Sequence, residues 1–376
     1  MSDELSKTNR FASKMLLTTA IALVLLSACG TPPAPPQPPP VPPPASGDLF
    51  LVDNLSGDVR GFAEVAGKLT PISGSAVRFA FPLFGFAADP NGSLVLGLSG
   101  SPLNIGSLQF ASIGPGGKLT PNTATTSVAG AAGADISVQG VIAVTDSTNA
   151  IVKLFTLQNG QFVAGASVSA GPLPKDVTFS SDGKFIYVGD DANGTISVFS
   201  VTSATSLQLV QTAQMPVAAG EFNPSLARVR LSAAGNKIAA TTVDGRIFVA
   251  DVNPASRMIA NAVEVHVAAN ANLQEVIFDP GGQSLYALDQ DNGSLYEFSL
   301  SGGVPQQLAG SPLATPLGPS GMAVNSTGDR VYVVVGPQSA VITYARNKQS
   351  GALSSTGDMI SSGGILGGRI IRVALH

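Results

Sequence analysis

The segment VTFSSDGKFIYVGDDANGTISVFSV, residues 177–201, indicates a repeat architecture because similar segments occur elsewhere in the chain. A shift of 99 residues places it without a gap on VIFDPGGQSLYALDQDNGSLYEFSL, residues 276–300. Shorter echoes of its second half occur at 50–62, 143–155, 238–250 and 332–344. Each echo reads as a strand, a tight turn and a second strand, and such self-similarity is typical of repeat architectures.

The first strand of each repeat can be counted separately. It lies at or near Phe86, Ile136, Val177, Val229, Val276, Met322 and Ile370, at spacings of 41 to 52 residues. Strands dominate and no helical period emerges, so each unit is expected to be a four-stranded antiparallel blade. Seven such blades need about 330 residues, and residues 48–376 supply 329. We therefore predict an all-β fold, a seven-bladed β-propeller.

The two ends of this region are expected to meet. Residues 48–54, DLFLVDN, match a second strand, whereas residues 368–376, GRIIRVALH, match a first strand. Pairing of these N- and C-terminal strands would complete one blade and remove open sheet edges. Apolar side chains occur on both faces of a strand, for example at Ile196 and Phe199. Packing between neighbouring blades must therefore supply the core.

Composition excludes several classes of function. Only 12% of the 376 residues are charged and the formal net charge is −4, whereas nucleic-acid binders carry a basic patch. The single cysteine, Cys29, allows neither an intrachain disulfide nor a cysteine metal cage. We expect a monomer with no cofactor, no metal and no nucleic-acid partner.

Residues 1–28 have the features of a secretory signal. Arg10 and Lys14 precede the apolar run 15–26, which is shorter than the roughly 20 residues of a membrane span but fits the hydrophobic region of a signal peptide. The run ends in Leu26-Ser27-Ala28-Cys29, which resembles the bacterial lipobox. An incidental cysteine after a plain secretory signal is the alternative.

The lipobox resemblance implies that Cys29 is acylated after cleavage and anchors the protein to a membrane of the bacterial cell envelope. Gly30, where an aspartate would favour inner-membrane retention, favours the outer membrane, facing the periplasm or the cell surface. Residues 29–47 are then a linker, with ten prolines between Thr31 and Ser46. We expect an extended polyproline II spacer; such segments also serve as ligands of aromatic grooves.

The best-preserved repeat, FSSDGKFIYVGDDANGTISVF at 179–199, is similar to that of the lactonase-type seven-bladed propellers and of the related Tyr-Val-Thr-Asn-repeat propellers. The resemblance implies the fold, and as an activity it implies hydrolysis of a sugar lactone. Enzymes of this family carry Pro-Arg-His just before a first strand. Here Pro174-Lys175-Asp176 stands at that place, and the chain has no Arg-His pair.

The propeller geometry suggests where a site would lie. Loops that enter the first strands and loops between second and third strands meet at one face, around the channel mouth. The catalytic candidates there are Lys175, Asp176 and Arg228, and the ligand-binding candidates are Arg230, Gln274, Glu275 and Ser320. Arg228 and Arg230 are two residues apart and share one side of their strand. Solvated loop residues are the alternative reading.

Other polar motifs are expected to be structural. Asp190 has counterparts at Asp53, Asp146 and Asp289, which indicates turn capping. The sequence DQDNGS at 289–294 opens like a calcium loop but has its glycine one position early and lacks the closing glutamate, so an Asn-Gly hairpin is expected. His266 is expected to be a packing or edge residue of an outer strand, without a second metal ligand.

Two functions follow. The favoured one is an envelope-anchored propeller that binds a protein partner or a small, carbohydrate-like ligand at one face without catalysis. The alternative is a lactonase-like hydrolase of a sugar lactone or related ester, which needs a group to deliver water and a cation for the oxyanion.

Overall fold

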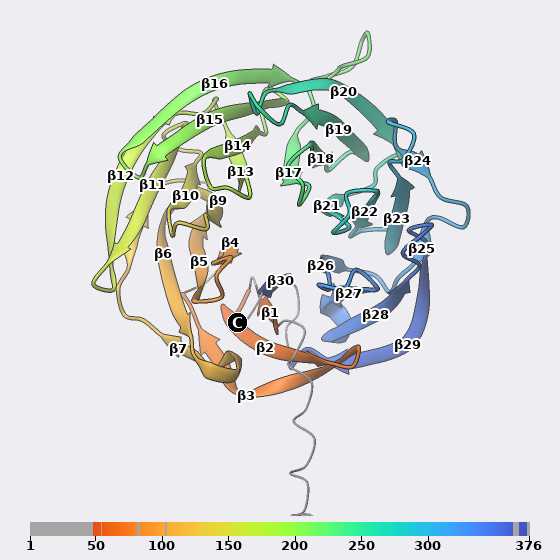
Figure 1. The fold of residues 1–376 in the computed structure, drawn as a ribbon, viewed down its shortest axis with the longest axis horizontal. Coiled ribbons are helices and arrows are strands. Elements are labelled where there is room, and N and C mark those ends of the chain that lie inside the picture. The colour runs from red at the N-terminus through yellow and green to blue at the C-terminus, as the bar shows by residue number, and fades with distance from the viewer. Residues whose placement is uncertain (1–47, 54, 81–82, 102–103, 364–367, 374–376) are drawn as a thin grey trace, which may run out of the picture. The chain divides into compact units, whose positions relative to one another are not determined.

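The computed structural model describes residues 48–53, 55–80, 83–101, 104–363 and 368–373. The predicted signal peptide, the lipidated Cys29 and the proline-rich linker lie outside these residues. The described strands form seven antiparallel sheets, which are arranged as blades around a ring (Figure 1). The prediction of a seven-bladed β-propeller is confirmed.

We number the blades in chain order, beginning with the blade that contains the first strand. Blade 1 comprises β1 (Asp48–Asp53), β2 (Asp58–Val65), β3 (Lys68–Arg78) and β30 (Gly368–Val373). Blade 2 comprises β4 (Leu83–Ala88), β5 (Leu94–Ser101), β6 (Asn104–Ile113) and β7 (Leu119–Pro121), with β8 (Thr126–Val128) also on β6. Blade 3 comprises β9 (Ala131–Ile136), β10 (Ile142–Asp146), β11 (Ile151–Gln158) and β12 (Gln161–Ser169). Blade 4 comprises β13 (Pro174–Phe179), β14 (Phe185–Asp190), β15 (Thr195–Ser203) and β16 (Ser206–Gln214).

The remaining blades repeat this order. Blade 5 comprises β17 (Leu226–Leu231), β18 (Lys237–Thr242), β19 (Arg246–Val252) and β20 (Ile259–His266). Blade 6 comprises β21 (Leu273–Phe278), β22 (Ser284–Asp289), β23 (Ser294–Ser299) and β24 (Gln306–Gln307), with β25 (Leu313–Ala314) also on β23. Blade 7 comprises β26 (Pro319–Val324), β27 (Arg330–Val335), β28 (Ala340–Arg346) and β29 (Leu353–Ser361). Two short 3-10 turns, Pro115–Gly117 and Gly336–Gln338, interrupt the strand pattern.

The ring closes as the sequence predicts. The inner strand of blade 1 is β30, which pairs antiparallel with β1 from Asp48↔Val373 to Asp53↔Gly368. This blade combines one C-terminal strand with three N-terminal strands. Pairing between the two ends of the propeller therefore closes the ring (Figure 1). No helix in the described part of the chain is long and apolar enough to cross a membrane.

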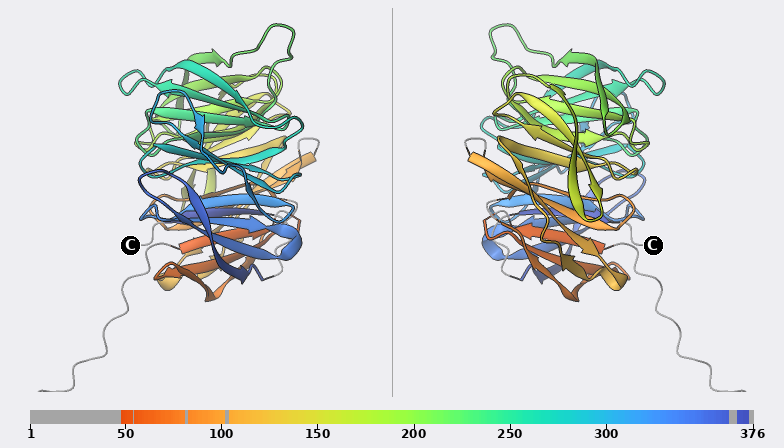
Figure 2. Two further views of the ribbon diagram at one scale, coloured as in Figure 1. Left: turned by 90° about the vertical axis from the view of Figure 1, so that its right-hand side faces the viewer. Right: turned by 90° about the vertical axis from the view of Figure 1, so that its left-hand side faces the viewer.

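The core lies between the blades. The buried apolar residues form clusters that each join two neighbouring blades, including one that joins blade 7 to blade 1. β1 illustrates the pattern: Leu49 and Leu51 pack against blade 7, whereas Phe50 and Val52 pack against blade 2. Successive side chains of a strand point to opposite faces, so a strand sandwiched between two blades needs apolar residues throughout. Side views show the blades stacked around the ring, with the β5–β6 hairpin (orange) extending beyond its neighbours (Figure 2).

An irregularity recurs at the start of the inner strands. The pairing register of β13, β17 and β21 shifts between the first and the third residue, at Pro174/Asp176, Leu226/Arg228 and Leu273/Glu275. The same shift occurs at Leu83/Gly85 in β4 and at Pro319/Gly321 in β26. A β-bulge turns the following side chains in a new direction. Here these are the side chains that face the middle of the ring.

Candidate functional site

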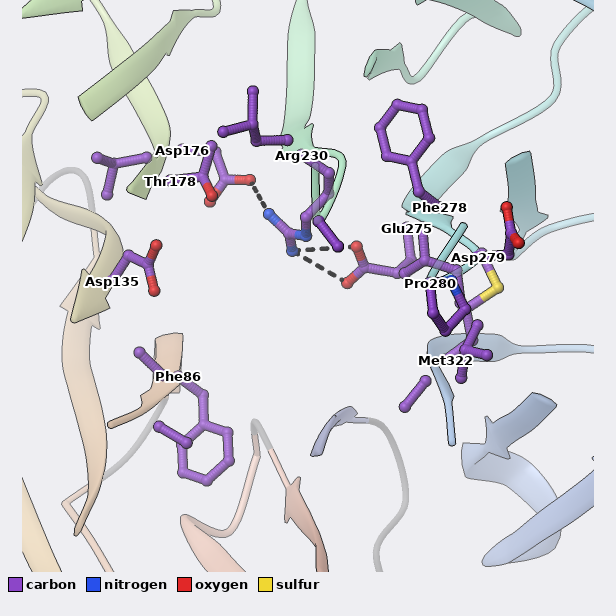
Figure 3. A pocket seen from close by; sticks show the side chains of 18 of the residues that line it. Phe86, Asp135, Asp176, Thr178, Arg230, Glu275, Phe278, Asp279, Pro280 and Met322 are labelled. Carbon is purple, nitrogen blue, oxygen red and sulfur yellow. Dashed lines mark hydrogen bonds and ion pairs between the residues drawn. The ribbon is translucent and has the colours of Figure 1, made fainter. Parts of the chain in front are cut away.

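A cavity of about 420 Å³ lies among the inner strands of blades 2 to 7. Its lining begins in the middle of these strands and continues into the loops that follow β17 and β21. Part of the wall is apolar, and the larger of these side chains are Phe86, Ile277, Phe278, Met322 and Val324. The ionisable residues of the lining are Asp135, Asp176, Arg230, Glu275 and Asp279 (Figure 3).

Arg230 is the centre of the charged part. Its Nη1 lies 2.7 Å from Asp176 Oδ2, and its Nη2 lies 3.0 Å from Glu275 Oε1. These two carboxylates come from the blades on either side of Arg230, so the ion pairs join three successive inner strands (Figure 3). Burial alone opposes the charged guanidinium, but Glu275 and Asp176 outweigh it and raise the pKa of Arg230. The cation is therefore permanently charged and held between two acids.

The backbone fixes both carboxylates. Asp176 is 2% exposed, and its Oδ2 also accepts a hydrogen bond from Val229 N at 3.0 Å. Glu275 is 5% exposed, and its Oε1 accepts from Val276 N at 3.2 Å. Both residues hold the third position of their strand, directly after the bulge. Charge-assisted hydrogen bonds of this kind fix side-chain orientation, so the cluster is preorganised.

Asp135 on β9 is the second titratable feature of the cavity. Burial raises the pKa of Asp135 to about 6, although hydrogen bonds from Phe179 N (2.7 Å) and Ile136 N (2.9 Å) and the charge of Arg230 act in the opposite direction. A carboxyl group with such a pKa exchanges a proton near neutral pH, which is the property required of a general base. The Asp135 carboxyl group is thus a candidate general base of the lining.

The lining carries an excess of negative charge among the described side chains. Four carboxylates face one guanidinium, which gives −4 + 1 = −3 when all are ionised. Asp279 is neutralised by Arg346, whose Nη2 lies 2.8 Å from Asp279 Oδ2, so the balance is −2. Since Arg230 is already paired twice, the cavity presents hydrogen-bond acceptors to a ligand rather than a free cation.

Of the seven candidates from the sequence, the structure brings Asp176, Arg230 and Glu275 together at the cavity. The other four, Lys175, Arg228, Gln274 and Ser320, are not part of its lining. Lys175 Nζ forms an ion pair of 2.7 Å with Asp191, and Arg228 Nη1 donates to its neighbour's carbonyl, Ala227 O, at 2.9 Å. Gln274 donates to Asn272, and Ser320 is half-buried on β26.

Sequence reasoning missed Asp135. It occupies the fifth position of β9, and Arg230 occupies the fifth position of β17. An alignment of the inner strands position by position would have found it. The expectation for His266 was also incomplete: Glu264, two residues earlier on β20, approaches His266 Nε2 to 2.7 Å, and Glu221 lies close to both. Residues two positions apart on a strand share one face. The sequence alone could therefore have predicted that Glu264 lies beside His266.

The aspartates at the ends of second strands are structural, as predicted. Asp190 Oδ1 accepts hydrogen bonds from Ala192 N (2.9 Å) and Asn193 N (2.7 Å). Asp289 Oδ1 accepts from Asp291 N and Asn292 N in the same way. These bonds close the turns to the third strands, and the DQDNGS motif is therefore a hairpin turn.

Comparison with known proteins supports the architecture. Residues 137–303 match a family described as "Lactonase, 7-bladed beta-propeller". No curated protein gave a significant match.

Solved structures resemble the whole ring. A candidate 6-phosphogluconolactonase from Bacteroides uniformis aligns with a TM-score of 0.74 and 15% identity, over 87% of this chain and 100% of its own. The periplasmic gluconolactonase of Pseudomonas aeruginosa aligns with a TM-score of 0.69 and 14% identity, over 87% and 100%. Hydrazine synthase of Kuenenia stuttgartiensis also aligns, with a TM-score of 0.53 and 20% identity over 73% and 80%.

Likeness at such identities establishes a shared fold, which carries many functions. The chain is a seven-bladed β-propeller, and its residues 137–303 match the family of lactonase seven-bladed propellers.

Proposed function

We propose that the propeller binds a small uncharged sugar or sugar lactone in the cavity at the middle of its ring. The observation that carries the proposal is the lining: preorganised carboxylates on one part of the wall and apolar side chains on another. The volume of about 420 Å³ lies within the range of small-molecule sites, roughly 300–1,000 Å³.

The chemistry of the wall suits hydroxyl groups. Asp135, Asp176 and Glu275 offer carboxylate oxygens, which accept hydrogen bonds from ligand O–H groups. Phe86 and Phe278 offer apolar surface for the C–H faces of a sugar ring (Figure 3). A few placed polar groups within an apolar wall are typical of ligand sites.

The charge of the wall selects against anions. Among the described lining residues, the only guanidinium is held by two carboxylates, and the net charge is negative. A phosphorylated sugar would bring its charge to a wall with an excess of carboxylates, and such repulsion is a source of specificity. The proposed ligand is therefore not phosphorylated, in contrast to the substrate named for the Bacteroides uniformis protein.

The comparisons support the ligand class. The family match is to lactonases, and the Pseudomonas aeruginosa neighbour is named a gluconolactonase. Lactone hydrolysis is the second candidate function, and the observation that favours it is the pKa of Asp135 near 6, which suits a base for water. Binding is favoured over hydrolysis because Arg230 is already ion-paired with Asp176 and Glu275. No described lining residue is therefore a free cation that could stabilise the oxyanion of the reaction.

Calorimetric titration of the purified full chain tests the proposal. Freshly dissolved D-glucono-1,5-lactone and D-glucose are expected to bind, and 6-phospho-D-gluconate is expected not to bind. Asp135→Asn keeps the side-chain shape but removes the charge and one of the two oxygens that accept backbone N–H groups. Loss of a charged hydrogen bond of roughly 1.5–3 kcal/mol to the ligand raises Kd about 10- to 100-fold. Asp358→Asn, on the exposed face of β29, is the matched control.

Two results would contradict ligand binding at this cavity: no heat with any uncharged sugar, or an unchanged Kd in Asp135→Asn. Acid release measured in the same samples separates the two functions. Lactone opening above the spontaneous rate, and lost in Asp135→Asn, would replace the binding proposal with hydrolysis.

We also propose that Cys29 carries a lipid anchor and that the propeller works in the bacterial cell envelope. The lipobox-like sequence before Cys29 and the proline-rich segment after it support this location. Cys29→Ser is expected to move the protein from the membrane to the soluble fraction of fractionated cells. Retention of the variant in membranes would refute the anchor.

A further inference from the structure

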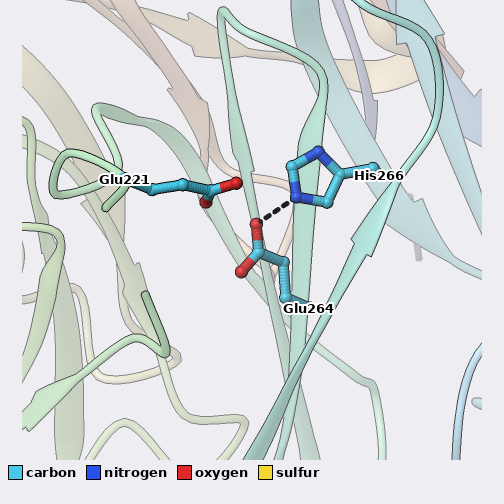
Figure 4. Close-up of side chains that lie close together, drawn as sticks. All are labelled: Glu221, Glu264 and His266. Atoms are coloured by element: carbon cyan, nitrogen blue, oxygen red, sulfur yellow. Dashed lines mark ion pairs between the residues drawn. The ribbon is translucent and has the colours of Figure 1, made fainter. Parts of the chain in front are cut away.

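We propose that Glu221, Glu264 and His266 bind one divalent transition-metal ion of the zinc class at the outer edge of blade 5. The proposal is independent of the central cavity. Glu264 and His266 lie on β20, the outer strand of this blade, and Glu221 lies in the loop between β16 and β17. The three side chains point toward one another (Figure 4).

The distances fit a site that closes around an ion. One ligand atom from each side chain lies within 4.8 Å of the other two, and His266 Nε2 lies 2.7 Å from Glu264 Oε1. Ligands bound at roughly 2.0–2.2 Å in a tetrahedron are about 3.4 Å apart. Glu221 and His266 have side-chain exposures of 39% and 58%, so both side chains have room to move until their ligand atoms reach this separation.

Glu264 supplies a further observation. Its Oε1 is buried and has no hydrogen-bond partner, even though His266 Nε2 is near. A buried carboxylate oxygen without a donor is costly. If His266 is protonated, this contact is an ion pair (Figure 4). If His266 is neutral, Nε2 and Oε1 place two lone pairs side by side, as two ligands of one cation would.

The surrounding charges also favour a dication. Arg246 is a cation close to the group, but its Nε and Nη2 are bound by Asp244 at 3.2 and 2.8 Å. Its contacts with Glu221 and Glu264 are longer, at 3.7 and 3.9 Å. Three carboxylates therefore face one guanidinium, an excess of two negative charges that a divalent ion would balance. No other group of three such ligands converges among the described residues.

The donor set defines the class of metal. One imidazole and two carboxylates suit zinc and similar transition metals, whereas calcium and magnesium prefer oxygen ligands alone. Three protein ligands leave one tetrahedral position for water. An ion bound here would fasten the loop before β17 to the outer strand of blade 5. Phe222, adjacent to Glu221 and 90% exposed, lies in the fastened loop.

Titration of the metal-free full chain with zinc chloride tests the site. One zinc ion per chain is expected, and His266→Ala and Glu221→Gln are each expected to raise Kd about tenfold or more. His376→Ala removes the only other histidine and serves as the control, with an unchanged Kd. Calcium and magnesium at the same concentration are expected not to displace zinc.

A second measurement follows the loop. Chymotrypsin cleaves after aromatic residues, and zinc is expected to slow cleavage after Phe222 in the wild type but not in His266→Ala. Equal melting temperatures of the metal-free proteins will establish that the variant is folded. Zinc binding that survives in His266→Ala, or that is lost in His376→Ala, overturns the proposal. Cleavage after Phe222 that is insensitive to zinc in the wild type also overturns it.

Discussion

At the scale of single residues, Asp190 ties two segments of its blade together. Its Oδ1 closes the turn after β14, and its Oδ2 accepts a hydrogen bond of 2.9 Å from Leu173 N, just before β13. Asp146 and Asp289 make the equivalent bonds to Gly130 N and Asn272 N. These buried acids therefore fix where the inner strands begin. Their role in function is indirect, since they position the strands that form the cavity.

Asp190→Ala is expected to destabilise the protein by about 1–3 kcal/mol, because it leaves three partly buried backbone N–H groups without their acceptor. Urea unfolding of the full chain measures the change. Asp358→Ala, on an exposed strand face, should stay within about 0.5 kcal/mol of the wild type. If Asp190→Ala also stays within this margin, the structural role assigned to Asp190 is wrong.

The raised pKa of Asp135 makes stability depend on pH. The folded protein holds this proton up to about pH 6, whereas the unfolded chain releases it near the ordinary value of 3.8. Between these two values the folded state binds more protons, so the free energy of unfolding decreases as pH rises. The decrease is complete above about pH 6.

Asp135→Asn removes this dependence. Between pH 3.5 and pH 7.5 the stability of the variant relative to the wild type is expected to rise by about 2 kcal/mol, allowing for the partial exposure of Asp135. Urea unfolding of both proteins across this range gives the difference. A difference that is constant with pH would mean that Asp135 titrates normally.

At the scale of elements, the inner strands approach each other closely where glycine replaces a side chain. A Cβ at Gly133 on β9 would lie 2.6 Å from Lys175 O and 2.9 Å from Asp176 Cα on β13. Both neighbours are backbone atoms and cannot turn away. The missing side chain thus sets the spacing of the blades that carry Asp135 and Asp176.

Gly133→Ala is expected to cost about 1–3 kcal/mol of stability through overpacking. It is also expected to weaken sugar binding, because it moves β9 away from β13. Thermal unfolding and calorimetry measure the two effects. Gly302→Ala is the control, since a Cβ there meets nothing within 4 Å. Equal stability of the two variants would show that the inner strands are not tightly packed.

The strands were predictable because the repeat occurs in every blade. Inner strands were expected at or near seven positions from Phe86 to Ile370, and all seven lie within β4, β9, β13, β17, β21, β26 and β30. The lining was only partly predictable. Asp176 and Glu275 share the third strand position with Arg228, yet the Arg228 guanidinium turns back to Ala227 O. Such a choice of rotamer depends on neighbouring blades, which the local sequence does not specify.

At the scale of the whole molecule, stability depends on closing the ring. Six residue pairs join β1 to β30, and the buried cluster between blades 7 and 1 includes Leu49, Leu51 and Tyr332. In a repeat protein each blade is stabilised chiefly by its neighbours. Loss of β30 would expose the edge of β1 and weaken the contact between the first and last blades.

Deletion of residues 364–376 is therefore expected to broaden the unfolding transition, lower its midpoint and promote association through the free edge of β1. Deletion of residues 374–376 alone retains β30 and should leave the transition unchanged. Urea unfolding and light scattering compare the two chains. Equal stability of both would contradict closure by β30.

The proposed ligand, an uncharged sugar or sugar lactone, is expected to bind among Asp135, Asp176, Arg230 and Glu275. The most direct measurement is the carbon NMR signal of the Asp135 side-chain carboxyl, assigned with the Asp135→Asn variant, during titration with D-glucono-1,5-lactone or D-glucose. This signal is expected to shift with saturation while the carboxyl signal of Asp358 stays fixed. A ligand that saturates the protein and leaves the Asp135 signal unmoved would exclude binding at this site.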